Sequence, residues 1–282
     1  MKFQLRNLDA LAVLFGEISL EAGSAILQHR GTDGHVITKA DGSPVTSADL
    51  AADEIICRRL AAELPGIPIV SEESAASAAI DGTEPFFLVD PLDGTREFVA
   101  GRNEFTVNIG LIENGKPTVG AVYAPALSLL YLAGAHAYAA TVLPGDALPP
   151  LHEMRLLKAR LLNKSGWCAV ASRSHLDRET QTWSDQHPVT EITHSGSSLK
   201  FCTIAEASAD VYPRLAPTME WDTAAGHAVL SAAGGYVVNV NGTLLRYGKP
   251  EYRNGSFIAW GRSPDERNTA LQDLQFVAED SL

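Results

Sequence analysis

The chain has 282 residues, 45% of them hydrophobic and 20% charged, and this balance excludes intrinsic disorder as its dominant state. At roughly 100–200 residues per domain, the length predicts two packed subdomains, which we place at residues 1–150 and 151–282. The formal net charge of −12 argues against a nucleic-acid polymer as partner, because such binding needs Lys and Arg to neutralise phosphates. A small phosphate ester fits this charge where metal ions supply the positive charge.

The three cysteines, Cys57, Cys168 and Cys202, cannot all pair internally, and their scattered spacing matches no zinc pattern. We interpret them as buried thiols of a reducing cytosol. Residues 1–7 lack a signal-peptide core, and no uninterrupted apolar run is long enough to span a bilayer. We therefore expect a cytoplasmic protein without a transmembrane segment, either free or peripheral on the cytoplasmic face of the inner membrane.

In the first half, apolar spacing predicts an amphipathic helix from Leu8 to Leu27 and a second helix from Ser47 to Ala62, stopped by Pro65 and Gly66. Short apolar runs then predict strands, with a hairpin turn at Asn114 and Gly115: Ile67–Val70, Phe86–Val89, Thr106–Ile112, Thr118–Tyr123, Leu129–Ala133 and Ala137–Val142. This half is predicted to pack helices on a largely antiparallel sheet.

The stretch from Leu143 to Leu151 contains three prolines and a glycine, which is typical of a surface loop at a subdomain edge. Beyond it, we predict a strand at Cys168–Ala171, helices from His175 and from Ser198, a strand around Val211, a helix at Asp222–Ala233, a strand at Tyr236–Val240, and a terminal strand and helix.

Acidic residues recur at the ends of predicted elements. Asp90 and Asp93 follow the strand Phe86–Val89, Glu72 and Glu73 follow Ile67–Val70, and Asp222 opens an Ala- and Gly-rich helix. Each has an ordinary structural alternative, since Asp93 and Asp222 could merely cap helices and Glu73 could be a solvated acid. Together they favour carboxylates converging on hard cations such as Mg²⁺.

Three runs in this order resemble the inositol monophosphatase superfamily of lithium-sensitive, magnesium-dependent phosphatases: SEES from Ser71, DPLDGT from Asp90 and WDTAAG from Trp221. Further runs resemble its bacterial CysQ-type 3′(2′),5′-bisphosphate nucleotidases: KADGSPVTSAD from Lys39, NEFTVNIGLIENGKP from Asn103, SRSH from Ser172, SLKFC from Ser198 and ADVYPR from Ala209. The resemblance implies a layered αβαβα sandwich with the active site between its halves. It also implies removal of the 3′-phosphate of 3′-phosphoadenosine 5′-phosphate, a small nucleotide, to leave AMP.

The resemblance also implies the ligands of two Mg²⁺ ions, and it leaves a third ion and the choice between monomer and homodimer open. One ion would be held by Glu72, Asp90 and the Leu92 carbonyl, and a second by Asp90, Asp93 and Asp222. Thr95 and Asp49 would activate the attacking water, with Asp49 as general base. Thr46 and Asp49 equally fit a capping box at the start of the second helix, and both roles could coexist.

For the substrate, the Gly94 and Thr95 amides would bind phosphate oxygens at a helix N-terminus. The resemblance places Ser174 and His175 near adenine or ribose, and it places Ser198, Lys200 and Arg214 near the second phosphate. The nearest alternative is hydrolysis of inositol phosphate or another sugar phosphate on the same metal core, against which Lys200, Arg214 and the SRSH run count. A non-catalytic metal- or nucleotide-binding regulator is a further alternative, which the Thr95 and Asp49 pair disfavours.

Overall fold

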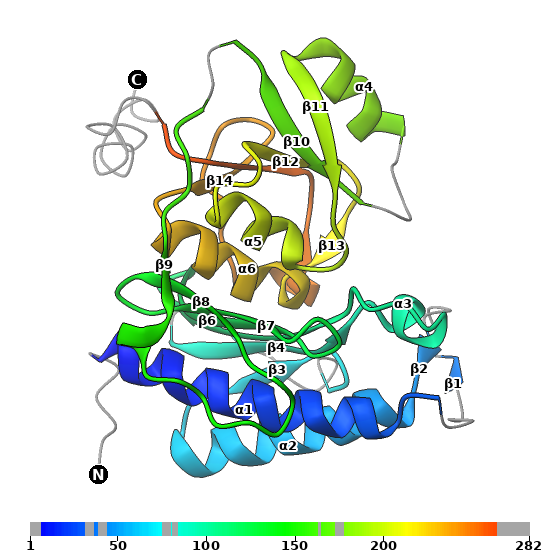
Figure 1. Ribbon diagram of the computed structural model, residues 1–282, viewed down its shortest axis with the longest axis vertical. Coiled ribbons are helices and arrows are strands. Elements are labelled where there is room, and N and C mark those ends of the chain that lie inside the picture. Colours follow the sequence, from blue (N-terminus) through cyan, green and yellow to red (C-terminus); the bar gives the residue numbers. More distant parts are fainter. Residues whose placement is uncertain are drawn as a thin grey trace.

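The computed structural model describes residues 7–31, 37–38, 44–74, 80, 84–162, 165–172 and 178–263. Its elements lie in layers: a pair of helices, a seven-stranded sheet, a second pair of helices, a five-stranded sheet, and a helix outside that sheet (Figure 1). The predicted α/β class and αβαβα order are confirmed. The predicted terminal helix lies outside the described residues.

The first layer consists of α1 (Leu8–Gln28) and α2 (Ser47–Glu63), within two residues of their predicted bounds. The Asn7 side chain caps α1 by accepting from Ala10 N, and the predicted capping box of Thr46 and Asp49 begins α2. By length and composition helix α1 could cross a bilayer, although Glu17 and Glu21 interrupt its apolar run. Its apolar side is nevertheless buried against α2 and the sheet, where the Phe15 and Phe87 rings meet edge to face. This is how a core helix packs.

The seven-stranded sheet is parallel between its first two strands and antiparallel elsewhere. In spatial order its strands are β3 (Ile69–Ser71), β4 (Phe86–Asp93), β5 (Thr106–Glu113), β6 (Lys116–Ala124), β7 (Leu129–Ala133), β8 (Ala137–Thr141) and β9 (Arg155–Leu157). Asn114 and Gly115 turn β5 into β6 with positive φ, as the sequence indicates. The sequence did not predict β9, which continues this sheet beyond residue 150, so the subdomain division stays a prediction.

The second pair of helices, α5 (Leu199–Ala205) and α6 (Trp221–Ala232), lies between the two sheets (Figure 1). The five-stranded sheet has the order β11 (Val189–His194), β10 (Trp167–Ala171), β12 (Val211–Arg214), β16 (Phe257–Trp260) and β14 (Tyr236–Asn239). Helix α4 (Arg178–Gln186) packs against β12. Smaller elements are α3 (Thr95–Val99), the strand pairs β1 (Ile37–Thr38) with β2 (Pro44–Val45) and β13 (Thr218–Met219) with β15 (Arg253–Asn254), and short 3₁₀ turns at Leu151–Glu153 and Pro250–Tyr252.

Two large apolar cores and one smaller cluster hold the described layers together. One core lies between α1, α2 and the first sheet, and the other fills the space between the two sheets around α5 and α6. The smaller cluster joins α4 to the five-stranded sheet through Trp183. Glycines allow the close contact in the second core, because a Cβ on Gly120 of β6 would lie 2.8 Å from the Ala228 Cβ of α6. All three cysteines are free thiols, as predicted, but only Cys168 and Cys202 are buried, and Cys57 is partly exposed. The tight packing of α6 on the first sheet fixes the side chains that α6 carries.

Candidate active site

A bulge in β4 brings Asp90 and Asp93 to one face of the sheet. Asp90 is opposite Asn108 of β5 and Asp93 is opposite Thr106, so two residues of β4, Pro91 and Leu92, face a single residue of β5. Asn108 and Thr106 are two residues apart, so their side chains lie on the same face of the sheet. Because the bulge places Asp90 and Asp93 opposite these two residues, both carboxylates lie on that face. The strand was predicted to end at Val89, with Asp90 outside the core. Instead β4 continues to Asp93, and Asp90 is only 1% exposed.

The alternative that Asp93 caps α3 is wrong, because Gly94 occupies the N-cap position and no side chain caps the helix. Gly94 has φ of 94°, and a Cβ at this position would lie 2.6 Å from Ser197 Oγ. The position therefore requires glycine for both its backbone conformation and its close contact. Asp93 remains available to face the cavity next to it.

Glu72 and Asp222 reach the same region from two other elements. Strand β3 is the parallel neighbour of β4, so Glu72, which follows β3, lies at the same edge as the β4 bulge. Asp222 lies in the first turn of α6, where its Oδ2 accepts from the Thr218 hydroxyl and, at 3.0 Å, from Met219 N. These bonds orient the carboxylate. The alternative that Asp222 merely caps the helix is wrong, because Glu220 occupies the N-cap position and no side chain caps α6.

Asp49 and Thr95, 46 residues apart in sequence, are hydrogen-bonded. The Thr95 hydroxyl lies 3.0 Å from Asp49 Oδ1 and 3.1 Å from the Leu92 carbonyl oxygen, and it can donate to either. The other carboxylate oxygen, Asp49 Oδ2, accepts from Thr46 N at 2.8 Å and from Thr46 Oγ1 at 2.6 Å. One oxygen thus completes the capping box while the other faces Thr95, so the geometry permits both roles and the role of Asp49 as general base stays a prediction.

The carboxylates act on one another electrostatically. Burial raises the pKa of Asp90 well above its usual range, and the charges of Glu72, Asp93, Asp222 and Asp49 raise it further. Burial and Asp222 raise the pKa of Asp93 to about 7, against the opposing effect of Lys200 and Arg214. Repulsion of this kind between buried acids is relieved by a bound cation.

The donor set consists of hard carboxylate and carbonyl oxygens, which fit Mg²⁺. Within the described part of the chain, however, no group of three or more His, Cys, Asp or Glu side chains is gathered tightly enough to hold a metal ion. The carboxylates therefore share one electrostatic region without converging on a point, and their assignment as ligands stays a prediction.

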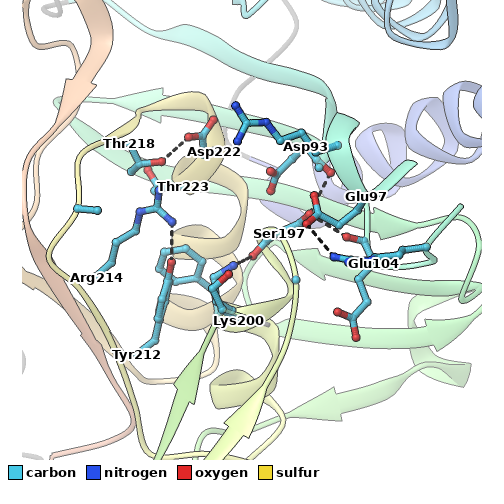
Figure 2. Close-up of a pocket in the computed structure, with 17 residues that line it drawn as sticks. Asp93, Glu97, Glu104, Ser197, Lys200, Tyr212, Arg214, Thr218, Asp222 and Thr223 are labelled. Carbon is cyan, nitrogen blue, oxygen red and sulfur yellow. Dashed lines mark hydrogen bonds and ion pairs between the residues drawn. The ribbon is translucent and has the colours of Figure 1, made fainter. Parts of the chain in front are cut away.

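A cavity of about 470 Å³ adjoins this acidic group, and Asp93, Gly94 and Asp222 lie in its wall. Figure 2 shows Asp93 and Asp222 at the top of the view, with Lys200, Arg214 and Tyr212 below them. The Lys200 ammonium donates to the Ser197 carbonyl at 2.6 Å and lies 5.4 Å from the Tyr212 ring centroid. The cavity therefore combines an acidic end with two fixed cations.

Arg214 is held by contacts that leave part of its guanidinium unpaired. Its Nη1 lies 3.5 Å from the Tyr212 hydroxyl and its Nη2 lies 3.3 Å from the Pro217 carbonyl, while the buried Nε has no hydrogen-bond partner among the described residues. The charges of Asp222 and Asp93, together with the Tyr212 contact, raise its pKa although burial alone would lower it. The group therefore stays a cation beside the acidic end of the cavity.

The predicted nucleotide contacts are only partly brought to this cavity. Lys200 and Arg214 line it, whereas the buried Ser198 hydroxyl donates to Asn108 Oδ1 at 2.5 Å and lies 2.9 Å from Thr106 Oγ1. Ser174 and His175 lie outside the described residues. Among the described residues, two serines line the cavity: Ser172, which opens the predicted SRSH run, and Ser197, which sequence reasoning missed because nothing in the SGSS run separates it from Ser198.

The sequence matches the inositol monophosphatase family over residues 7–276, and the chain belongs to that family. Membership implies dependence on a divalent metal ion. Among curated relatives, the 3′(2′),5′-bisphosphate nucleotidase CysQ of Shigella flexneri is 42% identical over 241 residues, covering 82% of this chain and 91% of the relative. The protein of the same name from Escherichia coli strain K12 is 41% identical with the same coverage.

Solved structures agree with this placement. The crystal structure of CysQ from Bacteroides thetaiotaomicron, a bacterial member of the inositol monophosphatase family, has a TM-score of 0.76 and 37% identity, covering 90% of this chain and 98% of that chain. An inositol monophosphatase from Anabaena has a TM-score of 0.68 at 24% identity, covering 94% and 96%, and shares the fold. The predicted family and layered fold are confirmed.

Proposed function

We propose that the protein is a magnesium-dependent phosphomonoesterase that hydrolyses the 3′-phosphate of 3′-phosphoadenosine 5′-phosphate to AMP and phosphate. Two independent lines support this. The relatives named for 3′(2′),5′-bisphosphate nucleotidase activity align with 82% of the chain at up to 42% identity. The cavity also joins an acidic group to two fixed cations.

The observation that carries the proposal is the pairing of opposite charges along one cavity. Asp93 and Asp222 stand at one end, and Lys200 and Arg214 are close enough to lower the pKa of Asp93. A substrate with two phosphates matches this pattern, since one phosphate can lie with cations at the acidic end and the other on Lys200 and Arg214. A monophosphate of an uncharged polyol would leave Lys200 and Arg214 without a phosphate to bind.

We assign the chemistry at the acidic end to Glu72, Asp90, the Leu92 carbonyl, Asp93 and Asp222, as the residues that hold two Mg²⁺ ions. When bound, such ions lower the pKa of a water molecule and neutralise the phosphate that is transferred. Thr95 would accept a hydrogen bond from the attacking water and donate one to Asp49 Oδ1; as Asp49, the general base, takes the Thr95 proton, the water proton passes to Thr95. A third ion, assembly as a homodimer and a cytoplasmic location stay predictions.

The test is phosphate release from 3′-phosphoadenosine 5′-phosphate and from inositol 1-phosphate, each with Mg²⁺ and with a chelator. We expect Mg²⁺-dependent turnover with a much larger kcat/KM on the nucleotide. Equal kcat/KM on the two substrates would remove the nucleotidase assignment and leave the phosphatase class in place. Mg²⁺ binding measured by calorimetry without turnover of either compound would instead favour a regulator.

A further inference from the structure

A residue just beyond α1 binds a loop that lies more than seventy positions away in the sequence. The Arg30 Nη2 atom donates to the carbonyls of Gly101 at 2.9 Å and Arg102 at 3.1 Å, and to Asn103 Oδ1 at 2.5 Å. Its guanidinium also lies 5.7 Å from the centroid of the Phe105 ring. The two carbonyls follow the C-terminus of α3, where a cation is favourable. Arg30 therefore fixes the backbone of residues 101–105 from outside.

The same loop forms one wall of the cavity. Arg102 and Glu104 line it, and the Ser197 hydroxyl lies 3.1 Å from the Glu104 carbonyl and 3.0 Å from the Asp93 carbonyl, as a donor to them. Ser197 has φ of 49°, and its own carbonyl accepts from Lys200. Arg30 thus holds the loop on the outside and Ser197 holds it on the inside. The Ser197 carbonyl also binds Lys200, which lies across the cavity from the loop.

The charges on this side of the cavity balance. Helix α3 and the loop after it carry two cavity-lining side chains of each sign: Arg96 and Glu97 on α3, and Arg102 and Glu104 in the loop. Arg102 Nη1 lies 3.9 Å from Glu97 Oε1, so these two charges offset each other. Figure 2 shows Glu104 and Arg214 on opposite sides of the labelled group, with Ser197 between them. A second phosphate therefore belongs on the side of Lys200 and Arg214, and the balanced wall faces an uncharged, hydrogen-bonding part of the substrate.

We propose that Arg30 is a positioning residue that sets the 101–105 loop as the wall contacting the nucleoside part of the substrate. It thereby governs affinity for the nucleotide and leaves the cleavage step unchanged. The inference rests on the proposed function for the identity of the substrate. The position of the loop itself can be measured without any substrate.

The experiment compares Arg30→Met, which keeps a long apolar stem, and Arg30→Lys, which keeps the charge. The matched control is Arg58→Met, which removes another partly exposed arginine on the helical layer, paired with Glu21 at 3.3 Å. Hydrogen exchange of the amides of residues 100–105 is measured without substrate. KM and kcat for 3′-phosphoadenosine 5′-phosphate and the inhibition constant of inorganic phosphate are then measured with Mg²⁺.

We expect Arg30→Met to speed exchange in this loop and to raise KM about fivefold, with kcat and the phosphate inhibition constant unchanged. The exchange rate and KM of Arg30→Lys should lie between those of Arg30→Met and the wild type. Arg58→Met should match the wild type in both. Unchanged exchange and KM in both Arg30 variants would overturn the inference. So would a phosphate inhibition constant that rises with KM, because the loop would then act on the phosphate end. Failure of the wild type to hydrolyse the nucleotide would count against the proposed function alone. Hydrogen exchange would still report whether Arg30 holds the 101–105 loop, a contact that we call the Arg30 clamp.

Discussion

The dual hydrogen bonding of Asp49 separates a stabilising role from a catalytic one. In Asp49→Asn, the side chain keeps its bond from Thr46 N only by turning its oxygen toward Thr46. The amide NH₂ then faces Thr95, whose hydroxyl retains only the Leu92 carbonyl, at 3.1 Å, as a proton acceptor. The variant therefore keeps the shape of the site and removes the base.

The matched control is Thr46→Ala, which breaks the capping box and leaves the bond between Thr95 and Asp49 Oδ1 intact. Loss of a cap costs about 1 kcal/mol of stability, so we expect Thr46→Ala to lose roughly that amount in urea unfolding and Asp49→Asn, which keeps its bond from Thr46 N, to lose less. Loss of a general base costs about 10²- to 10⁴-fold in kcat, and we expect that loss in Asp49→Asn alone. Phosphate release at saturating Mg²⁺ measures kcat. If the two variants lose kcat equally, Asp49 serves only as a cap.

Three further predictions concern buried charges. The folded-state pKa of Asp93, about 7, lies above its unfolded value. The free energy of unfolding of the metal-free protein should therefore fall by up to about 1.4 kcal/mol per pH unit as the pH rises from roughly 4 to 7. Urea unfolding with a chelator and with Mg²⁺ checks that the ion abolishes this fall. The pKa of His227 is lowered by burial to about 3, so stability should fall as the pH drops below 6.5, and His227→Gln should flatten that fall. Lys249 pairs at 2.7 Å with Glu220, which is fully buried. Lys249→Met leaves that carboxylate unpaired and should cost about 1–3 kcal/mol of stability in urea unfolding, and Glu220→Gln should cost less. Equal stabilities of the two variants would contradict the pairing.

Much of the fold followed from apolar spacing, because the helices and central strands bury regular faces. The predicted bounds of α1 and α2 differ from the structure by at most one residue, and β7 matches fully. The sequence missed β9 and β11, two edge strands whose side chains are mostly exposed and show no apolar alternation. It also ended β4 too early, because a bulge containing a proline resembles a strand end in sequence.

The candidate site was predictable where it depends on local motifs and not where it depends on contacts between distant loops. The pairing of Asp49 with Thr95 and the placement of Lys200 and Arg214 in a cavity agree with the sequence prediction. The choice of Ser197 over Ser198 depends on a positive φ that no residue type at that position signals. The clamp of Arg30 on the loop after α3 depends on tertiary packing alone.

The cleavage step and the selection of the substrate depend on different parts of the chain. Four of the five acids are built on β4, α2 and the first turn of α6, elements that are buried in the two cores and cannot shift independently, and the fifth, Glu72, lies in the turn after β3. The wall opposite Lys200 and Arg214 is a loop held by the side chains of Arg30 and Ser197. Substitutions in the first group should therefore change kcat and metal affinity together, whereas substitutions in the loop should change KM for one substrate relative to another. This separation allows one metal core to serve different phosphate esters through changes in a single loop.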